Sequence, residues 1–394
     1  MNWLYMLKKL KHLLEAVFWN LYYGFPASRL KVIGITGTDG KTTTVLMISH
    51  ILAAAGLKVG YISTVGFKVS GDAHESGLHV TTPNSHELQC LIRSAADQNL
   101  EYLILEVSSH ALDQYRVRGI KFSVSGITNV TPEHLDYHQT HQKYLETKAR
   151  LFRVSDFKIF NRDDKSYDYL KTTFSDSLAY SIAGQTDFTL DNTPLKLKSD
   201  AQYNYSNALL AVAIATTIGL DRFEAAKVLE TFEFPPGRGE VIQAQPFEVI
   251  IDFAHTPNGL KSFMGSLPKT KGRTIHVFGC AGERDRYKRS SMGAISADYS
   301  DIIILTSEDP RSERVENINR QIIEGIKQAK FKGQLLEIPD RREAIIKAIS
   351  LAKPKDLILI TGKGPEKSNN IRGIEYPWDE EKTVREVLNR RKML

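Results

Sequence analysis

The sequence predicts an α/β fold built from two successive parallel sheets. Apolar runs of strand length alternate with helical segments over residues 31–129, and a second alternating series covers residues 249–360. A turn with two glycines follows the first apolar run and leads directly into a helix. In such folds the carboxyl ends of the strands share one edge of the sheet, and ligands bind at that edge.

The turn after the first strand is predicted to bind phosphate. Lys31–Ile35 is the strand, and its glycines let backbone N–H groups approach phosphate oxygens at a helix N-terminus. Ile35 occupies a position where the general Walker A pattern has glycine, so the run is a variant of that pattern. A lysine in this loop reaches the terminal phosphates and a hydroxyl holds Mg²⁺. The predicted ATP-binding residues of the loop are Gly37, Thr38, Asp39, Gly40, Lys41, Thr42 and Thr43.

The boundary between the two sheets is predicted at Pro235 and Pro236, because a proline pair stops the preceding helix. We therefore expect a P-loop, parallel-sheet central ATPase domain in residues 31–235 and a Rossmann-like C-terminal domain in residues 236–394. An N-terminal amphipathic helix in residues 1–30 would precede them.

The N-terminal segment has apolar residues at helical spacing, interrupted by basic ones. The charges are too frequent for a membrane span, and we expect no signal peptide. We expect this helix to pack on its own protein, with a membrane surface or a partner protein contacted through residues 1–25 as the alternative. The residues at helical spacing are Trp3, Leu4, Leu7, Leu10, Leu14, Val17, Phe18 and Leu21.

Composition narrows the class of protein. Cys90 and Cys280 are the only cysteines, too few for a disulfide framework, which favours a reducing compartment and hence the cytoplasm. The net charge of +6 comes without a lysine run or an RNA-binding signature, so no nucleic-acid partner is expected.

Polar residues at two predicted strand ends are candidates for the phosphate site. Glu106 ends one apolar strand and Asn129 follows another. A carboxylate at such an edge is placed to bind Mg²⁺, which prefers oxygen ligands. From spacing alone, His134 and His138 could also bind a metal, but no cysteine or HExxH pattern joins them, which argues against zinc. A lone helical lysine such as Lys148 is ordinarily a surface charge.

Several runs, in this order along the chain, resemble those of the Mur ligase family. They are GTDGKTT at residues 37–43, EVSSHAL at 106–112, TNVTPEHLDYH at 128–138, YLETKARLF at 144–152, NRDD at 161–164, YNYSN at 203–207, PGRGE at 236–240, DFAHTP at 252–257, TSEDPRSE at 306–313 and TGKGPE at 361–366. Three of them together, EVSSHAL, the DPR within TSEDPRSE and the GKGPE within TGKGPE, favour the MurE branch. The resemblance covers nearly the whole chain from residue 32 onwards.

The resemblance implies an ATP- and Mg²⁺-dependent ligase that joins an amino acid to a carboxylate through an acyl phosphate. It implies that Thr42, Glu106, His134 and a carbamylated Lys148 are metal ligands, with Lys41, Lys148 and His134 catalytic. The implied nucleotide contacts beyond the loop are Asn204, Asn207, Arg238, Asp252 and His255.

The implied substrates are UDP-N-acetylmuramoyl-L-alanyl-D-glutamate and an amino acid, expected to be meso-diaminopimelate. Arg311 would form a two-point contact with the distal carboxylate of the amino acid. The family has Asp-Asn where this chain has Glu308 and Asp309, and either carboxylate could pair with Arg311 instead of the ligand. The implied substrate-binding residues are Thr81, Thr82, Ser108, Arg116, Arg284, Asp309, Arg311, Gly362 and Glu366.

Residues 278–289 form a second candidate anion-binding loop, with Arg284, Lys288 and Arg289 as cations. Only about thirty residues precede the phosphate loop, too few for the uridine-binding domain that the family usually carries there. Two alternatives therefore stay open. The chain could be a family ligase that acts on another carboxylate, of the folylpolyglutamate or cyanophycin type, or an ATP-binding relative without ligase activity.

Overall fold

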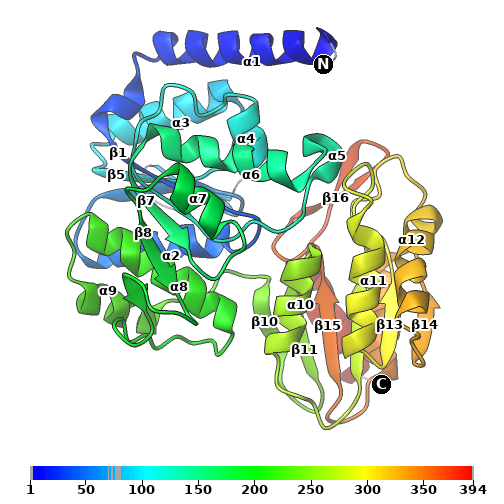
Figure 1. Ribbon diagram of the computed structural model, residues 1–394. Coiled ribbons are helices and arrows are strands. Elements are labelled where there is room, and N and C mark those ends of the chain that lie inside the picture. The colour runs from blue at the N-terminus through cyan, green and yellow to red at the C-terminus, as the bar shows by residue number, and fades with distance from the viewer. Residues whose placement is uncertain (1–2, 70, 72–73, 76–80, 393–394) are drawn as a thin grey trace. The chain divides into compact units, whose positions relative to one another are not determined.

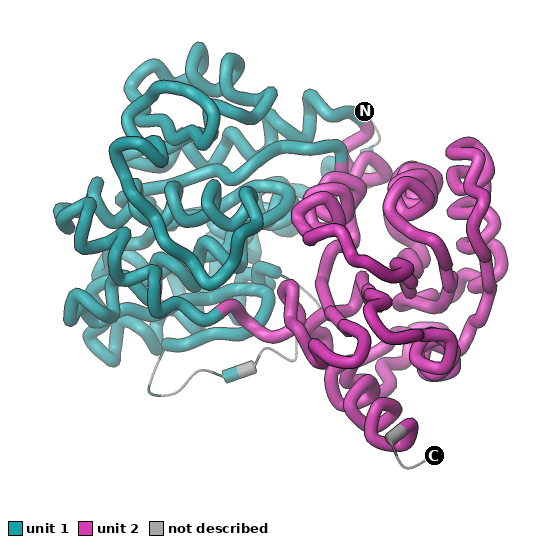
Figure 2. Tube along the Cα trace, turned by 90° about the horizontal axis from the view of Figure 1, so that it is seen from below, with its two compact units in different colours: residues 1–132, 140–233 teal, residues 133–139, 234–394 magenta. Residues whose placement is uncertain are grey.

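The computed structural model describes residues 3–69, 71, 74–75 and 81–392. The chain divides into two compact units, each with its own sheet (Figure 2). Unit 1 comprises residues 1–132 and 140–233, and unit 2 comprises residues 133–139 and 234–394. The short segment 133–139 thus packs with unit 2 although its neighbours in sequence belong to unit 1.

Unit 1 contains, within the described residues, a nine-stranded sheet in the order β4-β3-β2-β5-β1-β6-β7-β8-β9. Neighbouring strands run parallel except for the β2–β3 and β3–β4 pairs. The strands are β1 (Lys31–Thr36), β2 (Val59–Ser63), β3 (Gly66–Lys68), β4 (His74–Glu75), β5 (Tyr102–Glu106), β6 (Phe122–Ile127), β7 (Ser155–Asn161), β8 (Leu178–Ser181) and β9 (Phe188–Thr189).

Helices cover both faces of this sheet, which explains why β5 is buried at every position (Figure 1). Helices α2 and α8 lie on one face, and α3, α4 and α6 lie on the other. Side-chain caps fix several helix starts, for example Asn84, whose Oδ1 accepts from the N–H of Glu87 at 3.0 Å. The α-helices after the first are α2 (Lys41–Ala54), α3 (Ser85–Asp97), α4 (Ser109–Asp113), α6 (His141–Ala149), α7 (Tyr167–Thr173), α8 (Gln202–Thr217) and α9 (Arg222–Val228), and the 3₁₀ turns are η1 (Pro26–Arg29), η2 (Arg150–Val154) and η3 (Leu229–Thr231).

The N-terminal helix α1 (Trp3–Tyr22) lies against α3, but not through the face that the sequence led us to expect. Its contacts with unit 1 are largely polar: Lys9 Nζ lies 2.7 Å from Asp113 Oδ1, and the Asn20 amide donates to the carbonyl of Arg118 at 2.7 Å. The helix therefore packs on its own protein, as expected, but its apolar face is exposed. The described side chains of that face are Trp3, Met6, Leu7, Leu10, Leu14, Val17, Phe18, Leu21 and Tyr22, each 42–71% exposed. Residues 1–2 of the predicted segment lie outside the described part.

Unit 2 contains, among the described residues, a six-stranded sheet in the order β10-β11-β15-β12-β13-β14 and a separate β16–β17 hairpin. All neighbours in the larger sheet run parallel except β10 and β11. The strands are β10 (Arg238–Gln243), β11 (Glu248–Asp252), β12 (Thr274–Phe278), β13 (Ile302–Leu305), β14 (Gln334–Glu337), β15 (Leu357–Thr361), β16 (Ser368–Ile371) and β17 (Ile374–Pro377).

Two apolar clusters, one for each face of the larger sheet, form the core of unit 2. A buried ion pair between Arg341 and Glu380 ties helix α13 to helix α14, with Arg341 Nε 2.9 Å from Glu380 Oε2. The helices of unit 2 are α5 (Leu135–His138), α10 (Pro257–Ser266), α11 (Lys288–Tyr299), α12 (Val315–Gln328), α13 (Arg341–Leu351) and α14 (Glu380–Lys392). In the described part of the chain, no helix combines the length and the apolar character needed to cross a membrane.

Candidate active site

The phosphate loop, residues 37–43, connects β1 to the first turn of α2. Gly37 and Gly40 have φ angles of 145° and 83°, which side chains other than glycine rarely adopt. A Cβ at Gly37 would lie 1.9 Å from Thr128 Oγ1, and one at Gly40 would lie 2.3 Å from Asn207 Oδ1. Both positions therefore require glycine, and the loop backbone stays close to its neighbours.

Residues that follow β6 hold the loop in place. Asn129 accepts from Thr38 N through its carbonyl at 2.9 Å and from Asp39 N through its side chain at 3.0 Å. The Asn129 amide donates back to the carbonyl of Asp39 at 3.1 Å. Thr128 Oγ1 donates to the same carbonyl at 2.6 Å. The loop is thus fixed before any ligand binds, which reduces the ordering cost of binding.

The lysine of the loop folds across it. Lys41 Nζ donates to the carbonyl of Thr38 at 2.8 Å and is partly buried. The ammonium group therefore lies over the same turn whose backbone N–H groups would bind phosphate.

A hydroxyl and a carboxylate meet beside the loop. Thr42 Oγ1 donates to Glu106 Oε2 at 2.9 Å, because β5 pairs with β1 and places Glu106 opposite Ile35. Glu106 is 2% exposed and also accepts from the N–H and the hydroxyl of Thr64, at 2.9 and 3.1 Å. A carboxylate beside the threonine hydroxyl is the kind of oxygen ligand that a hard cation prefers.

Lys148 is not a surface residue, as a lone helical lysine ordinarily is. It projects from α6, is 1% exposed, and donates from Nζ to the carbonyl of Gly37 at 2.6 Å. Its ammonium also lies 4.4 Å from the centre of the Tyr144 ring, and the Tyr144 hydroxyl lies 3.2 Å from Thr38 Oγ1. Lys148 therefore reaches the phosphate loop from α6, whereas Lys41 is the first residue of α2.

A polar cluster follows the end of β5 on the side of α4. Thr82 Oγ1 donates to the carbonyl of Glu106 at 2.8 Å and accepts from Ser108 N at 3.0 Å. Arg116 donates to the carbonyl of Thr82 at 2.6 Å, and Thr64 Oγ1 lies 3.2 Å from Thr81 Oγ1. The structure therefore brings together the four substrate-binding residues that were predicted for this part of the chain.

The other predicted nucleotide contacts lie partly in each unit. In unit 1, Asn207 adjoins Gly40, while Asn204 donates to Ser199 at 2.9 Å. In unit 2, the Arg238 guanidinium stacks on the Phe253 ring at 4.4 Å.

The Asp252 carboxylate accepts from the N–H groups of Gly239 and Ala254 at 2.8 and 2.7 Å. Burial raises the pKa of Asp252 to about 6, against the opposing charge of Arg238. His255 Nδ1 lies 2.9 Å from the carbonyl of Phe253.

Unit 2 gathers a charged cluster from three separate segments, defined here as Arg284, Asp309, Arg311, Lys363 and Glu366. The buried Lys363 ammonium lies 2.9 Å from Asp309 Oδ1 and 2.5 Å from Glu366 Oε2. Although burial alone would lower it, the charges of Glu366 and Asp309 raise the pKa of Lys363. Burial lowers the pKa of Arg284, and the neighbouring charge of Arg311 lowers it further.

The backbone around Arg311 is strained. Asp309 and Arg311 have φ angles of 42° and 51°, and residues without glycine's freedom hold such angles only where the surroundings impose them. Asp309 N donates to Asn369 Oδ1 at 3.1 Å, and Arg311 N donates to the carbonyl of Asn370 at 3.0 Å. The β16 strand therefore fixes this loop.

Neither Glu308 nor Asp309 forms an ion pair with Arg311 in the described part of the chain. Arg311 donates from one guanidinium nitrogen to the carbonyl of Gly282 at 3.1 Å, and Asp309 pairs with Lys363. Glu308 is 6% exposed, and its Oε2 has no hydrogen-bond partner among the described residues. Burial raises the pKa of Glu308 to about 7. A Cβ at Gly362 would lie 2.1 Å from that oxygen, so glycine is required there too.

Two cations of the second predicted anion-binding loop serve the fold of unit 2 instead. The buried Lys288 ammonium lies 3.1 Å from Glu133 Oε1. Arg289 is fully buried and bonds to Glu313, Gln321 and the carbonyl of Ala281. For these two residues the prediction of an anion site is wrong, because both charges are already paired inside the unit.

His134 directly precedes α5, as its N-cap residue, and has a positive φ of 56°. It belongs to unit 2, whereas Thr42, Glu106 and Lys148 belong to unit 1.

Lys363 and Thr64 are polar residues that we did not single out from the sequence. Lys363 lies inside the TGKGPE run, and Thr64 directly follows the carboxyl end of β2, so both could have been found by position.

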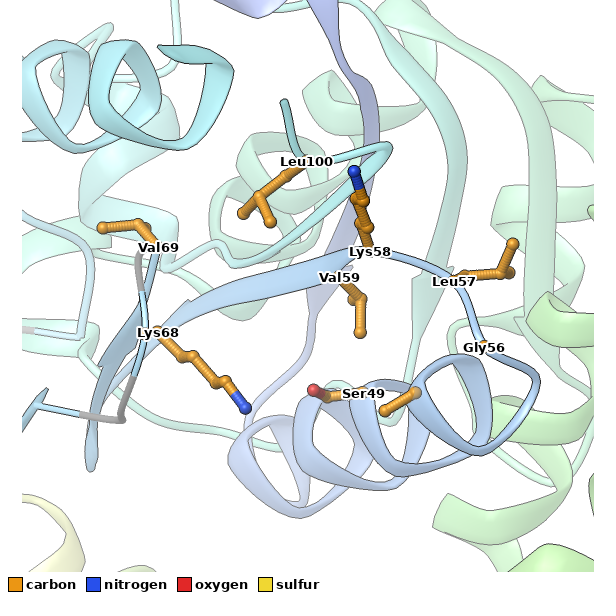
Figure 3. Close-up of a pocket in the computed structure, with 10 residues that line it drawn as sticks. Ser49, Gly56, Leu57, Lys58, Val59, Lys68, Val69 and Leu100 are labelled. Atoms are coloured by element: carbon orange, nitrogen blue, oxygen red, sulfur yellow. The ribbon is translucent and has the colours of Figure 1, made fainter. Parts of the chain in front are cut away.

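A pocket of about 320 Å³ opens elsewhere in unit 1 (Figure 3). Ser49, Lys58, Lys68 and Leu100 are among its lining residues. It lies at the C-terminal end of α2, and the phosphate loop precedes the N-terminal end of the same helix. It is therefore separate from the candidate active site.

Family models match both units of the chain. The Mur ligase middle domain matches residues 35–215, and the Mur ligase glutamate ligase domain matches residues 237–364. The chain therefore belongs to the Mur ligase family, whose members are ATP-dependent ligases that form amide bonds. Its ATP requirement follows from that membership.

Relatives of high coverage share one name. The UDP-N-acetylmuramoyl-L-alanyl-D-glutamate--2,6-diaminopimelate ligase of Clostridium botulinum (strain ATCC 19397 / Type A) is 34% identical over 95% of this chain and 81% of its own. The ligase of the same name from Aquifex aeolicus (strain VF5) is 38% identical over 93% of this chain and 79% of its own. The chain thus spans about four fifths of the length of these relatives.

Solved structures agree with the fold. A structure of UDP-N-acetylmuramoyl-L-alanyl-D-glutamate--2,6-diaminopimelate ligase aligns with a TM-score of 0.59 and 28% identity, over 92% of this chain and 79% of the other. The folylpolyglutamate synthase of Mycobacterium tuberculosis aligns with a TM-score of 0.70 at 18% identity, over 89% and 92% of the two chains. At that identity the second likeness supports the two-sheet α/β fold alone.

Proposed function

We propose that this ligase adds meso-diaminopimelate to UDP-N-acetylmuramoyl-L-alanyl-D-glutamate in the cytoplasm, where ATP is available. Relatives that match more than nine tenths of the chain carry the name of that activity. One observation carries the proposed use of ATP. Thr42 is hydrogen-bonded to Glu106 beside a loop whose conformation requires glycine at positions 37 and 40.

The residues around the loop suit a nucleotide with Mg²⁺. A hydroxyl and a buried carboxylate are hard oxygen ligands. Glycine at positions 37 and 40 lets the loop pack against Thr128 and Asn207, and it gives the turn the backbone angles of a phosphate-binding loop that leads into a helix N-terminus. Thr42 and Glu106 would hold Mg²⁺, which would neutralise negative charge on the phosphates when bound.

Lys41 would stabilise the charge that develops on the transferred phosphoryl group. A substrate carboxylate oxygen attacks the γ-phosphorus, the bond to the β-phosphate oxygen breaks, and ADP leaves. The amine of the amino acid then attacks the acyl carbon, and phosphate departs with the former carboxylate oxygen. The amide, ADP and phosphate are the products.

We propose that Lys148 is carbamylated in the active protein. Carbon dioxide would add to the neutral amine with loss of one proton, which converts a cation into an anionic oxygen ligand. The carbamate nitrogen keeps one hydrogen, so the 2.6 Å bond to the Gly37 carbonyl can persist after modification. The family resemblance also implies that His134 binds a metal ion.

The amino acid would be recognised by the charged cluster of unit 2. Its three cations and two carboxylates leave one positive charge, which complements an additional carboxylate on the ligand. Asp309 is already paired with Lys363, so Arg311 keeps guanidinium N–H groups for the distal carboxylate. Glu366 would accept from the distal ammonium.

A phosphate-release assay with purified protein tests this proposal. The acceptors are the muramoyl dipeptide nucleotide and a folate-type monoglutamate, each combined with meso-diaminopimelate, L-lysine or L-glutamate. We expect ATP turnover only when the muramoyl acceptor and diaminopimelate are both present. Turnover with the folate-type acceptor and glutamate, and not with the muramoyl acceptor, would contradict the proposal and support a ligase of the folylpolyglutamate type.

A further inference from the structure

The N-terminal helix presents a continuous apolar surface to solvent, separate from the candidate active site. This apolar stripe consists of Trp3, Met6, Leu7, Leu10, Leu14, Val17, Phe18, Leu21 and Tyr22, none less than 42% exposed. A helix that merely covered its own protein would bury such residues. Figure 1 shows α1 as a separate layer beyond α3.

The opposite face of α1 fastens the helix to unit 1. Lys9 pairs with Asp113, the Asn20 amide bonds to the carbonyls of Ala16 and Arg118, and the Trp19 ring packs 4.1 Å from that of His86. Ala16 and Asn20 are buried. These contacts fix the rotation of the helix, so the outward direction of the apolar stripe is built into the fold.

The charges beside the stripe are mainly positive. Lys11 is exposed within the stripe near its Tyr22 edge, and Lys8 is exposed just beyond that edge. Arg118, whose carbonyl accepts from Asn20, is exposed next to the helix. Glu15 is the one acidic residue of α1, and it lies 3.4 Å from His12 and 3.7 Å from Lys11. This charge pattern is complementary to an anionic surface.

The shape of the stripe favours a bilayer over a second helix. At about 100° per residue, the positions of Met6 and Tyr22 bound an arc of roughly 160°, wider than the narrow seam of a coiled coil. Trp3 and Tyr22 lie at its two ends, and both residue types are enriched where a bilayer meets water.

We propose that α1 binds the surface of a bilayer containing anionic phospholipids. The helix lies in the plane of that surface, with the apolar stripe among the acyl chains and Lys8 and Lys11 at the headgroups. Because α1 is fastened along unit 1, the ligase is held at the membrane without a spanning segment among its described residues.

Vesicle flotation with the full chain tests this proposal. Vesicles of phosphatidylcholine alone are compared with vesicles that also contain phosphatidylglycerol. The wild type should float with the anionic vesicles, and added salt should weaken the binding. Lys8→Gln combined with Lys11→Gln should weaken it roughly fivefold for each lysine.

Leu10→Gln combined with Leu14→Gln should weaken binding by at least about tenfold for each leucine. Both residues are exposed, so the fold should survive. The matched control is Phe223→Gln, which removes a 60% exposed aromatic residue on α9 and should float like the wild type. Brominated lipid should quench wild-type fluorescence more than that of Trp3→Phe.

Three outcomes would overturn the proposal. The wild type could stay with the unbound protein for both vesicle types, or the leucine variant could float as well as the wild type. Sedimentation could also show a dimer in solution that the leucine variant loses. The apolar stripe would then be an interface between two copies of the chain.

Discussion

The phosphate loop of unit 1 and the charged cluster of unit 2 are assembled in opposite ways. The loop is one contiguous run, residues 37–43, and its neighbours Thr128 and Asn129 bond mainly to its backbone. The charged cluster joins residues from three segments, and its central Lys363 contacts Asp309 across 54 positions of sequence.

This difference matters for specificity. A loop that binds through backbone N–H groups recognises phosphate, which is the same in every ATP-dependent ligase of this kind. A cluster of side chains can change its net charge through single substitutions, and so can change its amino acid. We infer that unit 1 supplies the common chemistry of ATP and that unit 2 supplies the choice of amino acid.

The largest expected effect is at the phosphate loop. Lys41→Ala should reduce ATP turnover by at least about a hundredfold, because it removes a charge that stabilises the transferred phosphoryl group. The fold should persist, since the one bond of the Lys41 side chain within the described residues is to the carbonyl of Thr38. Steady-state phosphate release measures the effect, and the exposed Lys58→Ala is the matched control. Near-normal turnover of the Lys41 variant would break the assignment of the loop.

Lys148→Ala should also lose most activity, by roughly a hundredfold, because an anionic ligand would be missing. Short carboxylates added to the variant should restore part of the activity, and they should not affect Lys143→Ala on the same helix. Intact mass measured without acid should show the added carbon dioxide in the wild type. An unmodified wild type together with a fully active variant would refute the carbamate.

Arg311→Ala tests the separate role of the charged cluster of unit 2. It should change the choice of amino acid and leave the use of ATP nearly intact. Losing a charge-assisted contact of about 1.5–3 kcal/mol should reduce the preference for meso-diaminopimelate over L-lysine by roughly tenfold to a hundredfold. The ratio of the two kcat/KM values measures this, with the exposed Arg314→Ala as control. A wild type that prefers lysine, or an unchanged ratio, would contradict the role of Arg311.

The smallest effect concerns stability near the cluster. The pKa of Glu308 is raised from 4.5 to about 7, so the unfolded chain loses this proton more readily than the folded one. The folded state is therefore penalised progressively as pH rises from 4.5 to about 7, and the penalty stays constant above that range.

The free energy of unfolding of Glu308→Gln should consequently exceed that of the wild type by up to about 3 kcal/mol at pH 8 and by little at pH 4.5. Urea unfolding at several pH values measures the difference, and the exposed Glu337→Gln serves as control. An advantage of Glu308→Gln that is the same at both ends of the pH range would contradict this interpretation.

Sequence patterns were sufficient wherever the determining residues are contiguous. The alternation of apolar strands and helices predicted both sheets, and the run from Gly37 to Thr43 predicted the loop geometry, because glycine is required at fixed points. The pairing of Glu106 with Thr42 followed from two adjacent strand ends.

Contacts between distant segments could not be predicted in this way. Periodicity groups Leu10 and Leu14 on one face of α1, but it does not say that Lys9 and Asn20 fasten the opposite face to unit 1. Similarly, the charges of Lys288 and Arg289 suggested an anion site, whereas their partners Glu133 and Glu313 lie elsewhere in the sequence.

The most direct test of the acyl-phosphate route follows one oxygen atom. The acceptor is prepared with ¹⁸O in its reacting carboxylate and incubated with ATP, Mg²⁺, meso-diaminopimelate and the wild-type chain. Mass spectrometry then measures the label in the released phosphate. If the reaction passes through an acyl phosphate, one ¹⁸O atom is transferred to phosphate for each amide formed. Amide formation with unlabelled phosphate, or no ATP-dependent amide at all, would contradict this route.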